Sequence, residues 1–171
     1  MNNFNLIFPG QGSQTVGMGL DLYQNHKRAR EVFDEVDEAL NFRLSKIIFE
    51  GPDESLKLTV NTQPAIMATS LAVVKVLEDE LKKDISSFSE VVLGHSLGEY
   101  SALTAAGSLS FSDTLKILKI RGNAMQNSIP KGEGGMVAVL GSEIEIIRKI
   151  IDENKNKYEC FIANDNSVGQ I

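Results

Sequence analysis

The run from Val91 to Tyr100, Val-Val-Leu-Gly-His-Ser-Leu-Gly-Glu-Tyr, constrains the fold of this chain more than any other segment. Ser96 lies between Gly94 and Gly98, which is the G-x-S-x-G pattern of a nucleophile elbow. In such an elbow a strand turns sharply into a helix, and side chains at the glycine positions would block their approach. The N–H groups at the helix start favour negative charge that develops beside the serine hydroxyl. The pattern therefore predicts an exposed, reactive Ser96; the plainer alternative is a tight turn in which Ser96 only caps the helix.

The residues on both sides of this motif fit a strand before it and a helix after it. Glu90–Leu93 is short, apolar and β-branched, as expected of a buried strand in a parallel sheet. Glu99–Ala106 is compatible with a helix, and Gly107 is suited to end it.

The rest of the first 130 residues predicts one more strand and three more helices. Residues 4–8 form the strand, and residues 29–40 form a helix with apolar side chains at helical spacing. A long helix runs from about residue 61 to 83, with Thr62 as its N-cap and Pro64 in its first turn. Its predicted apolar stripe consists of Ile66, Ser70, Val73, Val74, Leu77 and Leu81. A fourth helix spans about residues 112–128, and this alternation predicts an α/β fold with a mostly parallel sheet covered by helices.

A domain boundary is predicted in the glycine-rich segment 130–135, so residues 1–130 form one domain. Beyond it, residues 136–140, 142–154 and 158–164 predict a β-α-β unit, in which Ser142 and Glu145 have the spacing of a capping box. Two strands and one helix would leave an open sheet edge. We therefore expect the sequence to be incomplete at its C-terminus.

Composition narrows the class of protein. The 171 residues carry a formal charge of −6, which argues against general nucleic-acid binding. The one cysteine, Cys160, is interpreted as a small buried residue; it excludes an internal disulfide and leaves no cluster for a metal. The sequence contains no secretory signal and no membrane-spanning stretch, so we expect a cytoplasmic protein with no membrane partner.

Arg121 is the second candidate functional residue. Its helical neighbours at i−4, i−3 and i+4 are Ile117, Leu118 and Met125, so a guanidinium lies within or beside an apolar stripe. Arginine often covers apolar surface with its stem while its head reaches water. The alternative is a bidentate partner for a substrate carboxylate.

Together these segments resemble the malonyl-CoA:acyl carrier protein transacylases, along essentially all 171 residues. The resemblance is carried by residues 8–14 (Phe-Pro-Gly-Gln-Gly-Ser-Gln), 61–65 (Asn-Thr-Gln-Pro-Ala), 94–100, 121–122 (Arg-Gly), 136–138 (Met-Val-Ala) and 164–170. It implies an α/β-hydrolase-like core, of which this chain holds the N-terminal part. Residues 136–171 would be the first β-α-β of a small ferredoxin-like α+β subdomain inserted into that core.

The resemblance also implies an activity, partners and roles. Ser96 would carry the malonyl group of malonyl-CoA as an ester and pass it to the pantetheine thiol of acyl carrier protein, in fatty-acid biosynthesis. The N–H of Leu97 and, by resemblance, that of Gln11 would form the oxyanion hole. Arg121 would bind the free carboxylate of the malonyl group. No cofactor is implied, because the CoA thioester is itself the substrate.

Two further residues have weaker claims on the pocket. His95 adjoins Ser96, but adjacent side chains at a sharp turn usually diverge, so it is expected to shape the pocket wall rather than act as base. Gln63 precedes Pro64, which suggests turn chemistry, although the family places this segment near the active site. The family's base histidine comes from well after the elbow, and this sequence contains only His26 and His95.

Three alternatives stay open. The loop from Gly10 to Gln14 could cradle a phosphate, but Thr15 replaces the third glycine of G-x-G-x-x-G. The protein could be a serine hydrolase of the esterase or thioesterase type, which would not use an arginine in its pocket. It could also be an inactive truncated fragment that lacks the base histidine.

Overall fold

The structure is a computed structural model that describes residues 4–129 and 133–171. It divides into two compact units, and the division falls after Ile129. Part of the predicted boundary segment, residues 130–132, lies outside the described residues. Each unit is described below by itself.

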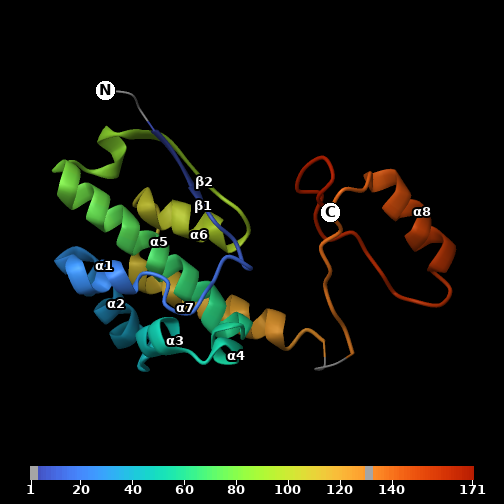
Figure 1. Cartoon of the computed structure of the whole chain (residues 1–171), viewed down its shortest axis with the longest axis horizontal. Helices are drawn as coiled ribbons and strands as arrows, with labels where there is room; N and C mark the ends of the chain where they lie inside the picture. The colour runs from blue at the N-terminus through green and yellow to red at the C-terminus, as the bar shows by residue number, and fades with distance from the viewer. Residues whose placement is uncertain (1–3, 130–132) are drawn as a thin grey trace. The chain divides into compact units, whose positions relative to one another are not determined.

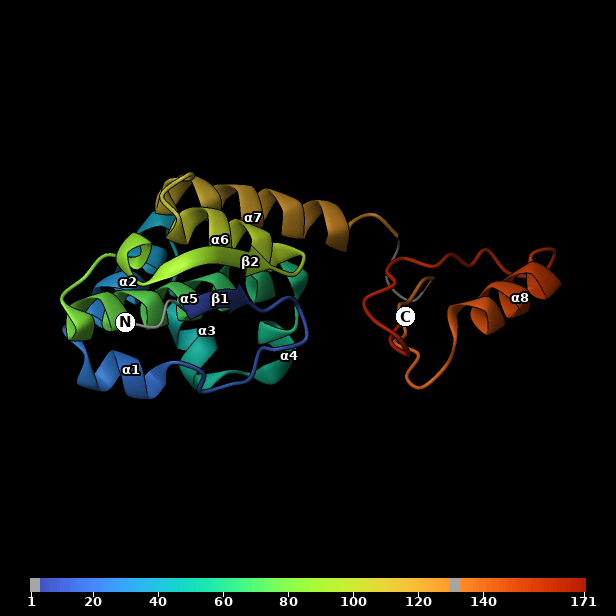
Figure 2. The ribbon, with the colours of Figure 1, turned by 90° about the horizontal axis from the view of Figure 1, so that it is seen from above.

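The first unit contains a two-stranded parallel sheet. Strand β1 (Phe4–Phe8) pairs with β2 (Ser89–Gly94), and the register places Phe8 opposite Gly94. The two strands are joined through a long helical segment, as a parallel pair requires. Both predicted strands are confirmed, and β2 ends where the elbow begins. Figure 2 shows the strands side by side, with α6 (Leu97–Ala105) next to them.

Helices make up most of the first unit (Figure 1). Besides α6 they are α1 (Leu20–Asn25), α2 (Lys27–Leu40), α3 (Leu44–Glu50), α4 (Asp53–Leu56), α5 (Thr59–Leu81), the short 3₁₀ helix η1 (Ile85–Ser87) and α7 (Phe111–Gln126). The helices predicted in this unit are confirmed, and each end lies within two residues of its predicted position. Gly107 follows α6 with a φ of 74°, the left-handed conformation that glycine adopts readily at a helix end. Within the described ranges, no helix combines the length and apolar character that a membrane crossing needs.

The core forms where α5 packs against α2, α6 and α7. The predicted apolar face of α2 is buried: Ala29, Val32, Phe33, Val36 and Leu40. Phe33 also belongs to an aromatic group with Tyr23 and Phe49, whose ring centroids lie 4.9–6.0 Å apart. Helix α7 contributes Leu115 and Leu118 to the same core.

The predicted N-cap and apolar stripe of α5 were wrong. The helix begins at Thr59, so Thr62 is not the N-cap; its hydroxyl donates to the Leu56 carbonyl at 2.6 Å. Pro64 lies inside the helix. Of the predicted stripe, Ile66 and Val74 are buried, but Val73, Leu77 and Leu81 are exposed. The close contact face instead uses small side chains, Ala65, Ala68 and Ala72, because α5 has neighbours on several sides.

The apolar sequence of β2 predicted a strand that is buried on both faces, and this prediction was wrong. Val91 is 44% and Leu93 is 52% exposed, while Phe8 of β1 is buried. The reason is that the helices of this unit lie on one side of the two strands (Figure 1). Successive strand residues point to opposite faces, so alternate apolar residues stay uncovered in the described part of the chain.

The second unit contains helix α8 (Ile144–Asn154) between extended segments. The two predicted strands are not formed in the described residues: residues 158–164 make no bridge, and of residues 136–140 only Leu140 makes one, an isolated antiparallel bridge to Gln170. A strand needs continuous pairing, which a single bridge does not supply. Ser142 is not a cap, since the N-cap of α8 is Glu143 without a side-chain hydrogen bond. Whether residues 136–171 belong to a ferredoxin-like subdomain stays a prediction.

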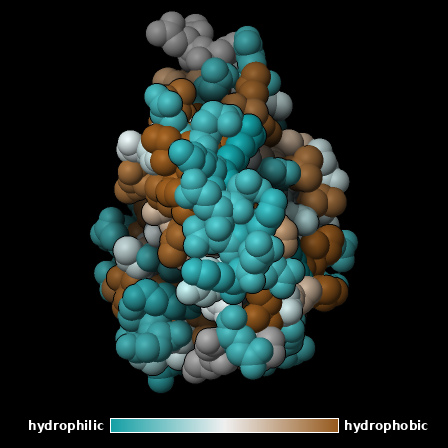
Figure 3. Space-filling view, turned by 90° about the vertical axis from the view of Figure 1, so that its right-hand side faces the viewer, coloured by the Kyte–Doolittle hydropathy of each residue, from teal (hydrophilic) through white to brown (hydrophobic). Residues whose placement is uncertain are grey.

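Apolar side chains of the second unit stay exposed among polar ones. They include Met136, Val137, Leu140, Tyr158, Phe161 and Val168, and hydrophobic residues are visible between hydrophilic ones on the face that Figure 3 shows. Cys160, expected to be buried, is also exposed. The extended segments have few neighbours to cover these side chains.

Candidate functional site

The turn between β2 and α6 holds Ser96 in an unusual backbone conformation. Its φ is 54° and its ψ is −111°, a region that non-glycine residues rarely adopt. The turn is fixed from both sides, because the N–H of His95 donates to the Phe8 carbonyl at 3.1 Å and the N–H of Gly98 donates to the His95 carbonyl at 2.9 Å. Strain of this kind persists only when the surroundings impose it, and it is concentrated at functional sites.

Gly94 and Gly98 allow the strand and helix to meet. A Cβ atom added at Gly94 would lie 2.0 Å from the carbonyl carbon of Gly98. A Cβ added at Gly98 would lie 2.3 Å from the Phe8 carbonyl oxygen. Both distances are far below contact, so no residue with a side chain fits at either position. The steric reason for the G-x-S-x-G spacing is therefore present in this chain.

The loop after β1 lies directly beside the elbow. A Cβ at Gly10 would lie 2.5 Å from Nδ1 of His95 and 2.8 Å from its carbonyl oxygen, so Gly10 lets the loop approach. The loop folds on itself, because Ser13 Oγ donates to the Gly10 carbonyl at 2.9 Å. Gln11 follows Gly10, and its Nε2 donates to Thr59 Oγ1 at 3.3 Å. The exposed imidazole of His95 thus borders this loop.

Leu97 is the first residue of α6, and its side chain is fully buried in the core. The first N–H groups of a helix have no acceptor within the helix. The N–H of Leu97 therefore belongs to the positive end of α6, next to Ser96.

Arg121 of α7 brings its guanidinium to Ser96. Its Nη2 donates to Ser96 Oγ at 2.9 Å, and its Nη1 donates to Gln63 Oε1 at 2.7 Å. The guanidinium carbon also lies 5.7 Å from the ring centroid of Tyr100, within cation–π range. The residues that the sequence singled out from three separate segments, Gln63, Ser96 and Arg121, therefore form one cluster.

Gln63 does not perform the turn chemistry suggested by its position before Pro64. It lies inside α5 with no exposed surface, and its Nε2 donates to Met125 Sδ at 3.2 Å. Sequence reasoning missed Tyr100 and Met125 as members of this cluster. For Met125 the available signal was spacing, since it lies four residues after Arg121 on α7. Tyr100 lies in the first turn of α6, which follows Ser96 directly.

The arrangement offers a hydroxyl on a strained turn, a helix start and a cation at one place. Among the residues that the structure describes, Arg121 is the only side chain hydrogen-bonded to Ser96 Oγ. A guanidinium donates only and stays protonated, so it cannot take the serine proton. This cluster can bind an anionic group and stabilise negative charge; the base that activates Ser96 is a separate requirement.

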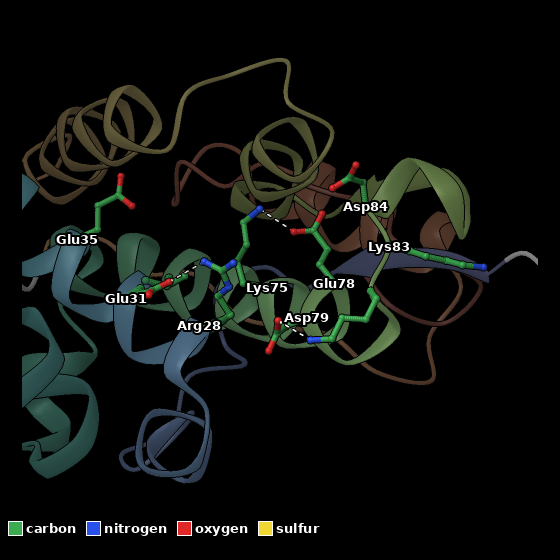
Figure 4. A pocket seen from close by; sticks show the side chains of 10 residues that line it. Arg28, Glu31, Glu35, Lys75, Glu78, Asp79, Lys83 and Asp84 are labelled. Atoms are coloured by element: carbon green, nitrogen blue, oxygen red, sulfur yellow. Dashed lines mark hydrogen bonds and ion pairs between the residues drawn. The ribbon is translucent and has the colours of Figure 1, made fainter.

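A cavity of about 510 Å³ lies elsewhere, between α2 and the end of α5 (Figure 4). Its cations are paired: Lys75 with Glu78 at 2.7 Å, and Lys82 with Asp79 at 3.0 Å. The hydrogen bond from Lys82 lowers the pKa of the Asp79 carboxyl. In these solvent-exposed ion pairs the positive and negative charges neutralise each other. None of the candidate site residues lines this cavity.

Comparisons with known proteins agree with this geometry. The acyl transferase domain family matches residues 5–168. The malonyl CoA-acyl carrier protein transacylase of Bacillus subtilis is 45% identical over 173 residues, which cover 100% of this chain and 53% of the relative. The protein of the same description from Haemophilus influenzae is 40% identical over 171 residues, covering 100% of this chain and 54% of the relative.

Two solved structures are similar in fold as well. The acyl-carrier-protein-S-malonyltransferase from Bartonella henselae has a TM-score of 0.91 at 49% identity and covers 99% of this chain and 54% of that chain. A malonyl-transacylase in complex with a type II PKS acyl-carrier protein has a TM-score of 0.89 at 36% identity. The match covers 99% of this chain and 53% of that chain. The chain thus spans about half the length of the relatives it matches.

Proposed function

Because the chain belongs to the acyl transferase domain family, we propose that it serves to transfer malonyl groups from coenzyme A to acyl carrier protein through Ser96. The hydrogen bond from Arg121 Nη2 to Ser96 Oγ, at 2.9 Å, carries this proposal. It joins a nucleophile to a cation that suits a substrate with a free carboxylate. The names of the relatives and the complex of a structural neighbour with its carrier protein support the same substrates.

The proposed reaction has two half-reactions. Ser96 Oγ attacks the thioester carbonyl of malonyl-CoA, the C–S bond breaks, and the serine proton ends on the CoA thiol. The malonyl-serine ester is then attacked by the pantetheine thiol of acyl carrier protein, which returns a proton to Ser96. This is covalent catalysis, in which one acyl transfer is divided into two reversible steps. We propose no cofactor, because the thioester already carries the activated acyl group.

The proposed oxyanion hole uses the N–H groups of Leu97 and Gln11. Leu97 N–H belongs to the start of α6, and the Gly10–His95 approach brings the Gln11 loop to the same turn. Losing one such donor typically costs about 3 kcal/mol of barrier. His95 is proposed to shape the wall between these two elements.

Arg121 is proposed to select the substrate. Its guanidinium can hold the carboxylate of a malonyl group, which an acetyl group lacks. The base that removes the Ser96 proton is proposed to be the histidine that the family resemblance implies well after the elbow, which is neither His26 nor His95. An α/β-hydrolase-like core with an inserted ferredoxin-like subdomain is proposed on the same resemblance.

A cytoplasmic location is also proposed, since the exposed Cys160 thiol suits a reducing compartment.

The test is acyl-enzyme formation on the chain itself. Incubation with radiolabelled malonyl-CoA followed by denaturation should leave label on the protein, and the label should move to acyl carrier protein when this is added. Ser96→Ala should retain no label. A wild-type chain that takes no label would contradict the proposal, and label on the variant would exclude Ser96 as nucleophile. Release of free malonate faster than transfer would indicate a hydrolase instead.

A further inference from the structure

We propose that Gln63 is a positioning residue that fixes the Arg121 guanidinium beside Ser96 while leaving its positive charge unpaired for the substrate. This inference rests on the proposed malonyl transfer and deepens it. Gln63 lies on α5 and Arg121 on α7, 58 residues apart, yet the two side chains meet at 2.7 Å. The contact is held in the core, because Gln63 has no exposed surface.

The partners of Gln63 set the direction of its amide. Arg121 can only donate a hydrogen bond, and the Met125 thioether can only accept one. Gln63 satisfies both, since Oε1 accepts from Arg121 and Nε2 donates to Met125 Sδ at 3.2 Å. In the reversed amide, the Gln63 NH₂ donor would face the Arg121 donor, and the Gln63 oxygen would face the Met125 acceptor. The buried amide is therefore locked with its oxygen toward the guanidinium.

The partners of Arg121 are all uncharged. Nη2 donates to Ser96, Nη1 donates to Gln63, and the guanidinium lies over the Tyr100 ring. In the described part of the chain no carboxylate forms a salt bridge with Arg121. A neutral amide fixes the cation in place without neutralising it. An acidic residue at position 63 would hold the guanidinium equally well but would compete with the substrate carboxylate.

Two substitutions separate these effects. Gln63→Glu keeps the shape and the contact to Arg121 but adds a negative charge. Gln63→Leu keeps the approximate volume but removes the contact, so the guanidinium can turn away. Both should reduce the preference for malonyl-CoA over acetyl-CoA by on the order of tenfold, which corresponds to one charge-assisted hydrogen bond. A purely structural role for Gln63 would weaken binding of both thioesters equally.

The experiment measures binding of malonyl-CoA and acetyl-CoA by calorimetry to the full chain carrying Ser96→Ala, which prevents turnover. Gln63→Glu and Gln63→Leu are then added singly. Thr114→Val is the matched control, because it removes a buried hydrogen-bonding group on the same helix α7 away from the cluster. It should leave the ratio of the two dissociation constants unchanged. An equal change of that ratio in the control would overturn the inference.

The failures of the two proposals are distinguishable. If the Ser96→Ala chain binds both thioesters equally or binds neither, the proposed malonyl specificity fails. If it prefers malonyl-CoA and both Gln63 variants retain that preference, only the role of Gln63 fails. The NMR signals of the Arg121 guanidinium provide a second test, independent of ligand and applicable to whichever variant folds. Rotation of the guanidinium should be slow in wild type and faster in Gln63→Leu; unchanged rotation would overturn the positioning role.

Discussion

Gly122 of α7 lies against Val60 of α5 so closely that an added Cβ would be 2.7 Å from the Val60 Cα and 2.9 Å from the Thr59 carbonyl oxygen. Both neighbours are backbone atoms, which cannot move aside as a side-chain end can. The contact sets the spacing of the two helices one residue away from Arg121. The hydrogen bond between Arg121 and Gln63 joins the same two helices.

Gly122→Ala should destabilise the chain by about 1–3 kcal/mol, because the added methyl group forces α5 and α7 apart. Urea unfolding followed by circular dichroism measures the change. Gly135→Ala is the control, since nothing lies within 4 Å of a Cβ at that position. Equal effects of the two substitutions would show that the helix contact is not responsible.

Arg121→Ala should abolish the proposed advantage of malonyl over acetyl transfer. Removing one partner of an ion pair with substrate lowers malonyl transfer by roughly two orders of magnitude, while acetyl transfer is retained or rises. Arg121→Lys should recover little, because an ammonium group cannot bind a carboxylate in the same bidentate manner. Transfer rates with both thioesters provide the measurement, and equal losses for both would remove Arg121 from substrate selection.

Leu118→Ala should cost about 2–5 kcal/mol of stability, since the side chain is fully buried in the core of the first unit. Ile120→Ala, two residues along the same helix, should change stability by less than about 0.5 kcal/mol because Ile120 is 69% exposed. The difference between their denaturant midpoints reports the packing of α7. Similar midpoints would mean that the buried face of α7 differs from the one described.

The start of α7 should become less stable in acid. Ser110 Oγ donates to Asp113 at 2.7 Å and accepts from its N–H at 3.1 Å. The hydrogen bond from Ser110, followed by the charge of Lys116, lowers the pKa of the Asp113 carboxyl. A carboxyl whose folded pKa lies below its unfolded pKa, about 3.9, stabilises the fold above that value and loses this contribution as pH falls through the folded pKa.

Asp113→Asn should therefore be less stable than wild type near neutral pH, and the difference should shrink as wild-type Asp113 becomes protonated. Thermal unfolding midpoints over an acid series measure this. A difference that stays constant with pH would show that ionisation of Asp113 is not involved.

The sequence predicted best those structural features that depend on residues close together along the chain. The strand-turn-helix around Ser96 follows from two glycines four residues apart, and the buried face of α2 follows from its periodicity. The predicted N-cap of α5 was wrong. Thr62 is a residue type that often caps a helix, but here its hydroxyl donates to the Leu56 carbonyl. The strands expected at residues 136–140 and 158–164 depend on pairing partners, which local pattern does not specify.

In the candidate site, too, single residues were predictable from the sequence, while the contacts between them were not. Ser96 and Arg121 were identified from their own segments, but their contact depends on how α7 crosses α5, which no single segment encodes. Gln63 was placed near the pocket by resemblance, and its role between a cation and a thioether emerged only from the packing. In the sequence, Met125 is only an apolar neighbour of Arg121 at i+4. Its sulfur becomes informative once the buried amide beside it is known.

The left-handed backbone of Ser96 implies a conflict between durability and reactivity at a single position. Glycine adopts that φ and ψ without a steric penalty, so Ser96→Gly would relax the turn and make the folded chain harder to unfold. It would also leave nothing to carry an acyl group. The proposed function therefore requires at position 96 a residue that is less stable there than glycine, because only the hydroxyl can form the ester.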